Sequence, residues 1–502
     1  MPLVRHWFSS LPIAIWVFLL SLPVFAQEKT PDLLQIVRSY ADTTIERGRD
    51  RYGALPSPLF ASTLDRKTTS LFQGEGLNRV VDIRREDWGI RPHDRMVTGA
   101  NPMHDQNLYQ ALYALTEVTG DRRYALEADR TLKWFFENCQ SPVTGLMAWG
   151  EHIGWDFNTE RLIEKDAGTT HEFFRPWVLW DRSFELAPEA CTRFARGLWE
   201  HQIDDHKTGN FSRHARYDQH GPGKDSEYPR HGGFYIATWA HAYNKTRGPV
   251  CLQAIQTLTT YFESRRNPVS GVIPAESNER SKGTTAWPPS NLSLAIDLWS
   301  AAERVPDDLA DFLRAAATRT DDVFLKMDHD LSAQGNGFLT RVDSETLAPQ
   351  DVAGHDARTQ LWATGYGEYT DANLALHCLA RYGQRQLEGY RRLILDAADR
   401  YLTSEPDIEF PVYPGTLGDV ISLLLGAHEI SGEQRYLDRA GHFADKAISL
   451  FIADGSPLPK ASSKHDHYEA ITRGDTLMMA LLNLWIVERR PEIKPAFVFC
   501  DR

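Results

Sequence analysis

The sequence has few cysteines and no cysteine pair at metal-binding spacing. Only five cysteines occur in 502 residues, and they are widely separated. A disulfide framework or a cysteine-rich zinc site needs more thiols at closer spacing, so neither is expected. Cys139, Cys191 and Cys378 lie in apolar stretches with helical spacing, which predicts buried free thiols. We therefore expect side-chain packing to hold the fold together.

An excess of positive charge is also missing. The chain has 55 basic and 68 acidic residues, which gives a net charge of −13. Nucleic-acid binding draws its affinity from clustered cations that neutralise phosphates. A nucleic-acid partner is therefore not expected, and an anionic ligand would need a locally basic site.

Long apolar runs are scarce. The one that stands out, Leu11 to Val24, follows a basic start at Arg5 and His6 and leads to Ala26. It is shorter than the roughly 20 residues that a membrane-spanning helix needs. The pattern is typical of a cleavable signal peptide over residues 1–26, with an uncleaved anchor as the alternative. We expect a periplasmic or secreted protein with no membrane contact after cleavage.

What the sequence does contain is a repeated helical hairpin. Two copies are clear, at 108–136 and 420–451, and each has two apolar-periodic arms separated by a short turn with glycine. Looser copies occupy 234–264, 292–326 and 370–403. One hairpin cannot bury its apolar face alone, so successive copies must pack against one another.

The repeats predict an all-α fold, an α/α toroid of (α/α)7 or (α/α)6 type. Residues 27–502 are expected to form a single catalytic domain, with 27–100 as an irregular lead-in. The hairpins are separated by connections longer than compact domains usually have. These connections are 141–170, 205–233, 265–291 and 328–368. Long loops at one rim of a ring are where a functional site is expected.

Side chains suited to catalysis gather between Trp149 and His231. His152, Glu172 and His214 come from three separate segments. Two imidazoles and a carboxylate are enough protein ligands for an open transition-metal site. The spacing alone leaves a structural role open, because isolated histidines are commonly only hydrogen-bonded and Glu172 could be a helix-start charge.

The same stretch resembles a known family. The run His171-Glu-Phe-Phe-Arg-Pro-Trp, followed by Arg193-Phe-Ala-Arg-Gly-Leu-Trp-Glu-His and by Ser212-Arg213-His214, is similar to the central segment of polysaccharide lyase family 2. This family contains periplasmic and cytoplasmic pectate lyases. Its catalytic centre has a histidine, then a glutamate, then an adjacent arginine–histidine pair, and the same order occurs here.

The resemblance implies both a reaction and a site. His152, Glu172 and His214 would bind a divalent transition metal, and Arg213 would be the catalytic base in β-elimination of pectate or oligogalacturonides. Manganese is the first expectation, with cobalt, nickel or zinc as alternatives. Calcium fits less well because it prefers an all-oxygen shell. The family also has an (α/α)7 barrel.

The resemblance does not extend evenly along the chain. Residues 50–60 are similar to the N-terminal segment of the family. Residues 265–370 and 464–469 could not be matched, which leaves the substrate subsites open.

Arg213 is an unusual base because a free guanidinium has a pKa above about 12. Burial and a neighbouring metal would both lower that pKa. In the alternative interpretation, Arg213 clamps the substrate carboxylate, and His171 or Tyr217 removes the proton.

Other residues near these segments could contact an acidic glycan. The cationic candidates are Arg175, Arg216, Lys224 and Arg230. The aromatic candidates are Trp149, Trp155 and Trp177, for which core packing is an equal expectation. His465, His467 and Glu469 have the ligand types for a second metal, although a polar rim loop is the simpler interpretation.

Two other functions fit a toroid. A glycoside hydrolase acting on a uronic-acid glycan would use two carboxylates across the scissile bond. Its candidates are Asp156, Glu160, Asp166 and Glu172. A non-catalytic glycan-binding toroid would use the same loops only for capture.

Overall fold

The computed structural model describes residues 32–163, 170–219, 227–275, 283–351, 356–363, 365 and 368–502. Asp32–Arg502 forms one compact unit. The predicted signal peptide over 1–26 lies outside the described residues, as do Asp166 and Lys224. Among the helices that are described, none combines the length and the apolar character that crossing a membrane requires.

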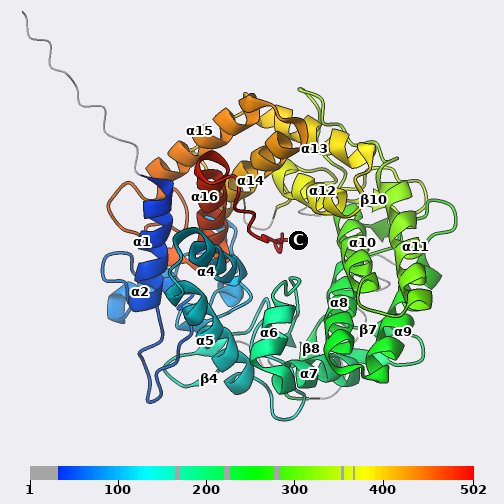
Figure 1. Ribbon diagram of the computed structural model, residues 1–502, viewed down its shortest axis with the longest axis horizontal. Coiled ribbons are helices and arrows are strands. Elements are labelled where there is room, and N and C mark those ends of the chain that lie inside the picture. The colour runs from blue at the N-terminus through cyan, green and yellow to red at the C-terminus, as the bar shows by residue number, and fades with distance from the viewer. Residues whose placement is uncertain are drawn as a thin grey trace, which may run out of the picture. The chain divides into compact units, whose positions relative to one another are not determined.

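The helices of this unit form a ring with an inner and an outer layer (Figure 1). The inner layer consists of α4 (Gln106–Thr119), α6 (Trp180–Leu186), α8 (Pro229–Thr246), α10 (Pro288–Ala302), α12 (Asp371–Arg385), α14 (Pro414–Ser431) and α16 (Gly474–Arg489). The outer layer consists of α5 (Arg123–Asn138), α7 (Pro188–Gly197), α9 (Pro249–Arg265), α11 (Asp307–Phe324), α13 (Glu388–Tyr401), α15 (Gln434–Phe451) and α1 (Leu33–Glu46).

Each inner helix packs against the outer helix that follows it, and α16 packs against α1 from the other end of the chain. The described residues therefore contain seven helical pairs, and the predicted α/α toroid is confirmed in its (α/α)7 form. All five predicted hairpins are present. The pair α6–α7 and the pair α16–α1 were not predicted. Helix α1 lies within 27–100, the segment expected to be an irregular lead-in.

Short local signals set the ends of the inner helices. Helices α8, α10 and α14 each begin with a proline, whose missing N–H costs nothing at the first helical position. Helices α4 and α14 end at Gly120 and Gly432, which have φ of 74° and 73°. Glycine adopts this left-handed conformation without strain. The chain can therefore reverse into the outer helix at once.

The remaining elements are short and lie in the connections. The helical ones are α2 (Gly74–Val81), α3 (Arg85–Trp88), η1 (Pro92–Asp94), η2 (Leu198–Gln202) and η3 (Ala470–Thr472). The strands are β1 (Thr63–Leu64), β2 (Gly99–Ala100), β3 (Trp155–Asp156), β4 (Arg161–Leu162), β5 (Thr170–His171), β6 (Ile203–Asp205), β7 (Asn210–Phe211), β8 (Ala215–Arg216), β9 (Thr285–Ala286), β10 (Val342–Asp343) and β11 (Tyr468–Glu469). They pair antiparallel as β1–β11, β2–β3–β4, β5–β8, β6–β7 and β9–β10.

The four long connections all lead into inner helices, namely α6, α8, α10 and α12. They therefore share the rim of the ring at which the inner helices begin, as expected. Beneath this rim lies an aromatic core centred on Trp149, which is fully buried and packs against Phe173 and Trp177. Trp149 and Trp177 are thus core residues that cannot stack on a sugar, whereas Trp155 is half-buried.

Burial of the thiols follows the expectation. Cys139, Cys191 and Cys378 are buried and free, and so is Cys500. Cys251 is half-buried and also unpaired. None of the five cysteines forms a disulfide, so non-covalent contacts join the helices.

Candidate active site

His152, Glu172 and His214 lie together at the rim where the inner helices begin. One ligand atom from each residue lies within 4.8 Å of the other two. Oε2 of Glu172 is 3.0 Å from Nε2 of His214 and 3.6 Å from Nε2 of His152. The structure thus brings the three predicted metal ligands into one cluster.

A short ladder and a glycine place these residues. Strands β5 and β8 pair His171 with Ala215, which sets the next residue, Glu172, beside His214. On the other side, the backbone of Gly150 passes so close to Glu172 that an added Cβ would lie 2.6 Å from its carbonyl oxygen. Gly150 also has φ of 144°, a conformation that side chains disfavour. Only glycine fits here, and it holds His152 near Glu172.

Glu172 is an ionised carboxylate inside the protein. Its side chain is buried, and burial opposes ionisation. Three cationic or hydrogen-bonding partners outweigh this effect: Nε of Arg213 lies 3.3 Å from Oε1, His214 contacts Oε2, and Nε2 of His231 is 3.2 Å from Oε1. Together they hold the pKa of Glu172 well below its usual range. The carboxylate is therefore ready to bind a cation at neutral pH.

His152 is oriented by a second carboxylate. Its Nδ1 lies 2.9 Å from Oδ1 of Asp94, and Asp94 is itself held by Nε of Arg91 at 2.7 Å. A proton on Nδ1 that is donated to Asp94 leaves the lone pair of Nε2 facing Glu172. Carboxylates commonly orient metal-binding histidines in this way. The donor set, two imidazole nitrogens and one carboxylate, fits an open transition-metal site.

Arg213 lies directly beside this cluster. Its Nε is 3.3 Å from both Oε1 of Glu172 and Nε2 of His214. The guanidinium also stacks over the ring of Tyr228, with 4.4 Å between its carbon and the ring centre. About a fifth of the side chain is exposed, so it can reach a ligand at the cluster.

Three residues of the site were missed from the sequence. His231 and Asp94 contact Glu172 and His152 as described above. Glu151 lies with Oε2 3.4 Å from Nε2 of His152. Burial and the nearby charge of Glu172 raise the pKa of Glu151 to about 8. Only proximity in the fold identifies these residues, because their sequence positions carry no motif of their own.

Of the two alternative bases, His171 lies in the interior and Tyr217 is half-buried. His171 is fully buried, its Nδ1 is 3.3 Å from Oε1 of Gln202, and burial lowers its pKa to about 4. Tyr217 donates its hydroxyl hydrogen to the carbonyl of Cys139 at 3.4 Å, and burial raises its pKa. Neither side chain lines the cavity that adjoins the cluster, and Arg213 does not line it either, so the cavity wall does not distinguish the three candidate bases.

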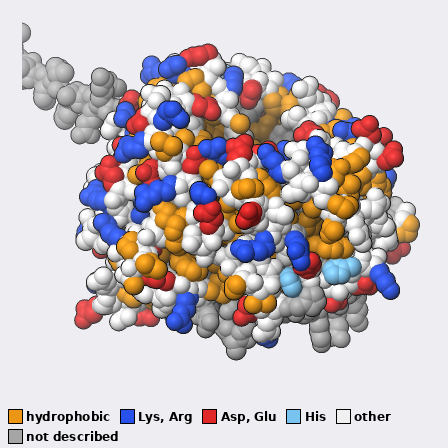
Figure 2. Space-filling model, turned by 60° about the horizontal axis from the view of Figure 1, so that its bottom comes forward, with side chains coloured by type: hydrophobic (Ala, Val, Ile, Leu, Met, Phe, Trp, Pro, Cys, Tyr) orange, Lys and Arg blue, Asp and Glu red, His pale blue; other side chains and the backbone are white. Residues whose placement is uncertain are grey.

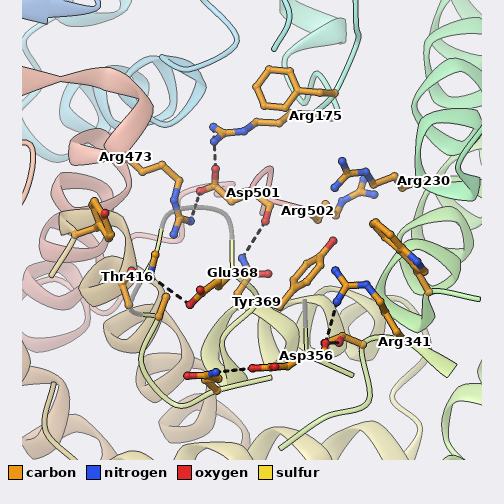
Figure 3. A pocket seen from close by; sticks show the side chains of 18 of the residues that line it. Arg175, Arg230, Arg341, Asp356, Glu368, Tyr369, Thr416, Arg473, Asp501 and Arg502 are labelled. Carbon is orange, nitrogen blue, oxygen red and sulfur yellow. Dashed lines mark hydrogen bonds and ion pairs between the residues drawn. The ribbon is translucent and has the colours of Figure 1, made fainter. Parts of the chain in front are cut away.

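That cavity has a volume of about 510 Å³ and lies where the inner helices begin (Figure 3). Glu151 lies in the wall of the cavity and also close to His152. The cavity therefore adjoins the cluster of His152, Glu172 and His214, which we call the metal-type cluster. The wall is rich in arginine. The arginines are Arg175, Arg230, Arg341, Arg358, Arg473 and Arg502. Figure 2 shows basic and acidic side chains interspersed over the face that it displays.

Part of this charge is neutralised within the cavity. Asp501, next to the C-terminal end at the centre of the ring in Figure 1, lies 3.1 Å from Arg175 and 3.2 Å from Arg473. Arg502 pairs with Asp297 of α10. Of the cationic candidates from the sequence, Arg175 and Arg230 line the cavity and Arg216 is exposed outside it.

Residues 79–246 match the family described as periplasmic pectate lyase. The matched segment is about a third of the chain and contains His152, Glu172, Arg213 and His214. It confirms the resemblance stated from the sequence, although residues 50–60 lie outside it. The match indicates a carbohydrate-active enzyme.

Several solved structures are also similar to the chain. The cellobiose 2-epimerase from Bacillus thermoamylovorans is 10% identical, with a TM-score of 0.49 over 91% of this chain and 99% of that chain. A D-mannose isomerase is 10% identical, with a TM-score of 0.49 over 93% and 100% of the two chains. An unsaturated glucuronyl hydrolase from a Bacillus species is 12% identical, with a TM-score of 0.45 over 92% and 97%.

Two of the four carboxylates of the rival hydrolase hypothesis, Asp156 and Glu160, form hydrogen bonds away from the cluster, whereas Glu172 belongs to it and Asp166 lies outside the described residues. Oδ1 of Asp156 accepts backbone hydrogen bonds from Asn158 and Thr159 at 3.0 and 2.9 Å. Glu160 accepts a hydrogen bond from the backbone N–H of Leu55. Asp156 therefore stabilises its own turn, Glu160 contacts the segment before β1, and neither lines the cavity.

His467 and Glu469, two of the candidates for a second metal site, are engaged with protein side chains instead. Glu469 forms two hydrogen bonds of 2.7 Å with Arg95, and Nε2 of His467 lies 2.7 Å from its Oε2. All three side chains are buried. His465 instead contacts Ser462. Arg95, Glu469 and His467 thus form a buried ion-pair network that joins β11 to the segment before β2.

Proposed function

We propose that this protein cleaves pectate or its oligomers by metal-assisted β-elimination and releases 4,5-unsaturated products. The observation that carries the proposal is the cluster of His152, Glu172 and His214 with Arg213 beside it. The family match over the same residues supports it. The arginine-rich cavity next to the cluster suits an anionic substrate.

β-Elimination in a uronate removes the proton at C5 and expels the oxygen at C4. The C5–H bond is weakly acidic, because its neighbour is a carboxylate that already carries a negative charge. A divalent metal held by His152, Glu172 and His214 would bind that carboxylate and withdraw charge from it. We propose manganese first, with cobalt, nickel or zinc as alternatives and calcium as the least suited.

The side chains of the protein have separate tasks in this scheme. Asp94 holds His152 in the tautomer that leaves Nε2 unprotonated. Glu172 contributes the negative charge that offsets a bound cation. Arg213, in its neutral form, removes the proton at C5. The electron pair of the C5–H bond then forms the C4–C5 double bond as the C4–O bond breaks, and the departing oxygen takes up a proton from the solvent.

Arg213 is the best-placed base among the candidates. His171 is buried against Gln202, and the hydroxyl of half-buried Tyr217 is engaged by the carbonyl of Cys139. Partial burial and a bound metal cation would lower the pKa of the Arg213 guanidinium, which is the direction that a base requires, whereas the carboxylate of Glu172 at 3.3 Å acts in the opposite direction. We assign the proton transfer to Arg213 from its position beside the cluster, rather than a purely clamping role.

We also propose that the enzyme works in the periplasm or outside the cell. The pattern at residues 1–26 supports export, and the matched family is described as periplasmic. The substrate would then be an extracellular acidic glycan or its fragments.

The test is an ultraviolet assay on polygalacturonate with purified mature protein. We expect absorbance of 4,5-unsaturated uronide to rise, to stop after chelation and to return with manganese. The variant His214→Ala should not recover with manganese. New reducing ends without ultraviolet absorbance would instead indicate hydrolysis. No product of either kind would contradict the proposed function.

A further inference from the structure

Two arginines in the cavity wall, Arg230 and Arg341, have no direct ion pair with a described carboxylate. Across the part of the chain that the structure describes, neither Arg230 nor Arg341 forms an ion pair, and Nε of each is buried without a hydrogen-bond partner. Figure 3 shows both side chains on the same side of the cavity. The other arginines there contrast with them, because Arg175 and Arg473 pair with Asp501.

Arg341 is especially constrained. The residue is only 7% exposed, and its guanidinium lies over the ring of Trp287 at 4.8 Å. One NH1 hydrogen is donated to the main-chain oxygen of Asp356 at 2.9 Å, while the carboxylate of Asp356 accepts a hydrogen bond from Gln360 at 2.7 Å. A buried cation that faces a cavity with unused donors is costly unless a ligand satisfies it.

Arg230 also lies at a position that is unfavourable for a cation. It lies in the first turn of α8, where the positive end of the helix disfavours a cation. Trp287 stands immediately before α10, so the positive ends of two helices meet at this wall. Both helix ends and both guanidinium groups attract an anion. A side chain in a position that destabilises the fold, with no compensating contact, is expected at a functional site.

A row of stacked side chains connects this wall to the proposed active site. Arg213 lies over Tyr228 at 4.4 Å, the ring of Tyr228 lies 4.7 Å from that of Trp287, and Trp287 lies under Arg341. The two aromatic rings thus separate the base from Arg341. Arg230, Trp287 and Arg341 line the cavity that adjoins the cluster, so a chain of sugars that reacts beside Arg213 can reach them through this cavity.

We propose that Arg230, Arg341 and Trp287 form a subsite for a second uronate carboxylate, on a sugar other than the one at the metal-type cluster. The planar fork of a guanidinium matches a carboxylate with two hydrogen bonds. Trp287 lines the cavity beside the two arginines, and its ring holds the guanidinium of Arg341 in place. The ligand class rests on the proposed function. The substrate needs at least two uronate units, and the second must carry a free carboxylate rather than a methyl ester.

The test is calorimetric titration of trigalacturonate into chelated protein, in which no turnover occurs. We expect Arg230→Met and Arg341→Met each to weaken binding about tenfold or more, because each removes charge-assisted hydrogen bonds. Lys245→Met removes a positive charge from the exposed far end of α8 and should leave the affinity unchanged. Arg341→Lys keeps the charge without the fork and should fall between wild type and Arg341→Met.

Fully methyl-esterified trigalacturonate, which lacks free carboxylates, is the control ligand. We expect the arginine variants and the wild type to bind it equally. Unchanged affinity for the acid in both arginine variants, or an equal loss for the ester, would overturn the subsite. Thermal unfolding of each variant checks that the loss is not one of folding.

The subsite and the proposed function fail in different ways. Binding of trigalacturonate that depends on both arginines, without any ultraviolet product, would contradict the lyase and keep the subsite. An ultraviolet product combined with normal binding by both variants would contradict the subsite alone. Absence of trigalacturonate binding by the wild type would also contradict it.

Discussion

Asp94 shows how a residue outside the ligand set can govern a metal site. Its carboxylate is buried, and it fixes the ring of His152 from the side opposite Glu172. We expect Asp94→Asn to lower the manganese affinity about 10- to 100-fold, because the amide no longer fixes the tautomer and basicity of His152. Titration calorimetry with manganese measures this effect. Asp82→Asn, at an exposed position, is the control. Equal manganese affinity in Asp94→Asn and wild type would refute this role.

Arg213 is the residue at which base and clamp can be told apart. Arg213→Ala should lower kcat on polygalacturonate by about 10²- to 10⁴-fold, which is the usual contribution of a general base. Manganese affinity should not fall, because the variant removes a cation that lies beside Glu172 and His214. Steady-state kinetics with manganese titration measures both quantities. A raised KM with kcat retained would favour the clamp.

The sequence predicted only those residues of the candidate site that belong to the family motif. His152, Glu172 and His214 were identified by their order, which a family resemblance made specific. Asp94 and His231 were missed, because each reaches the cluster from a different connection or helix start and nothing in its local sequence marks it. Proximity of this kind arises from the ring and not from any one segment.

Among the elements, the pair β1–β11 joins the two ends of the unit. Thr63 pairs with Glu469, whose carboxylate is clamped by Arg95 and His467. Burial alone would raise the pKa of Glu469, but the neighbouring charges lower it to about 2. An unfolded glutamate titrates near pH 4.3. The ionised form therefore stabilises the fold above that pH, and this contribution is lost as the pH falls toward 2.

This pair predicts a pH dependence of unfolding. Between about pH 5 and about pH 2 the free energy of unfolding should fall by roughly 3 kcal/mol through Glu469 alone. Glu469→Gln should be less stable than the wild type at pH 7, and this difference should shrink at pH 3. Urea unfolding at several pH values measures it, with the exposed Glu488→Gln as the control. A variant that keeps the full acid sensitivity of the wild type would contradict the assignment.

Helical elements were predicted where they are long and amphipathic. Hairpins such as α4–α5 and α14–α15 have arms of 14 to 18 residues, so their apolar periodicity is visible. Helix α6 has only seven residues, which is too short for a periodic signal. The pair α16–α1 could not be found by a search for consecutive arms, because its helices lie at opposite ends of the chain.

At the scale of the whole molecule, the segment after α16 lies inside the ring and contacts residues on several of its sides. Asp501 contacts Arg175 before α6 and Arg473 before α16, and Arg502 reaches α10. NH1 of Arg502 donates to Oδ2 of Asp297 at 2.9 Å and to Oγ of Ser293 at 2.7 Å. These contacts tie together segments that are far apart in the sequence. No sequence pattern predicted them, because they depend on the ring having closed.

Removing one partner of this central network should weaken the whole unit rather than one hairpin. Arg502→Met leaves Asp297 buried without its cation, and loss of one member of a buried pair costs about 3–5 kcal/mol. We expect urea unfolding to remain a single transition at a lower midpoint. Arg490→Met, at an exposed position in the same segment, should unfold like the wild type. A separate early transition in Arg502→Met would instead mean that α10 and its neighbours unfold independently, and that the inner contacts do not couple the ring.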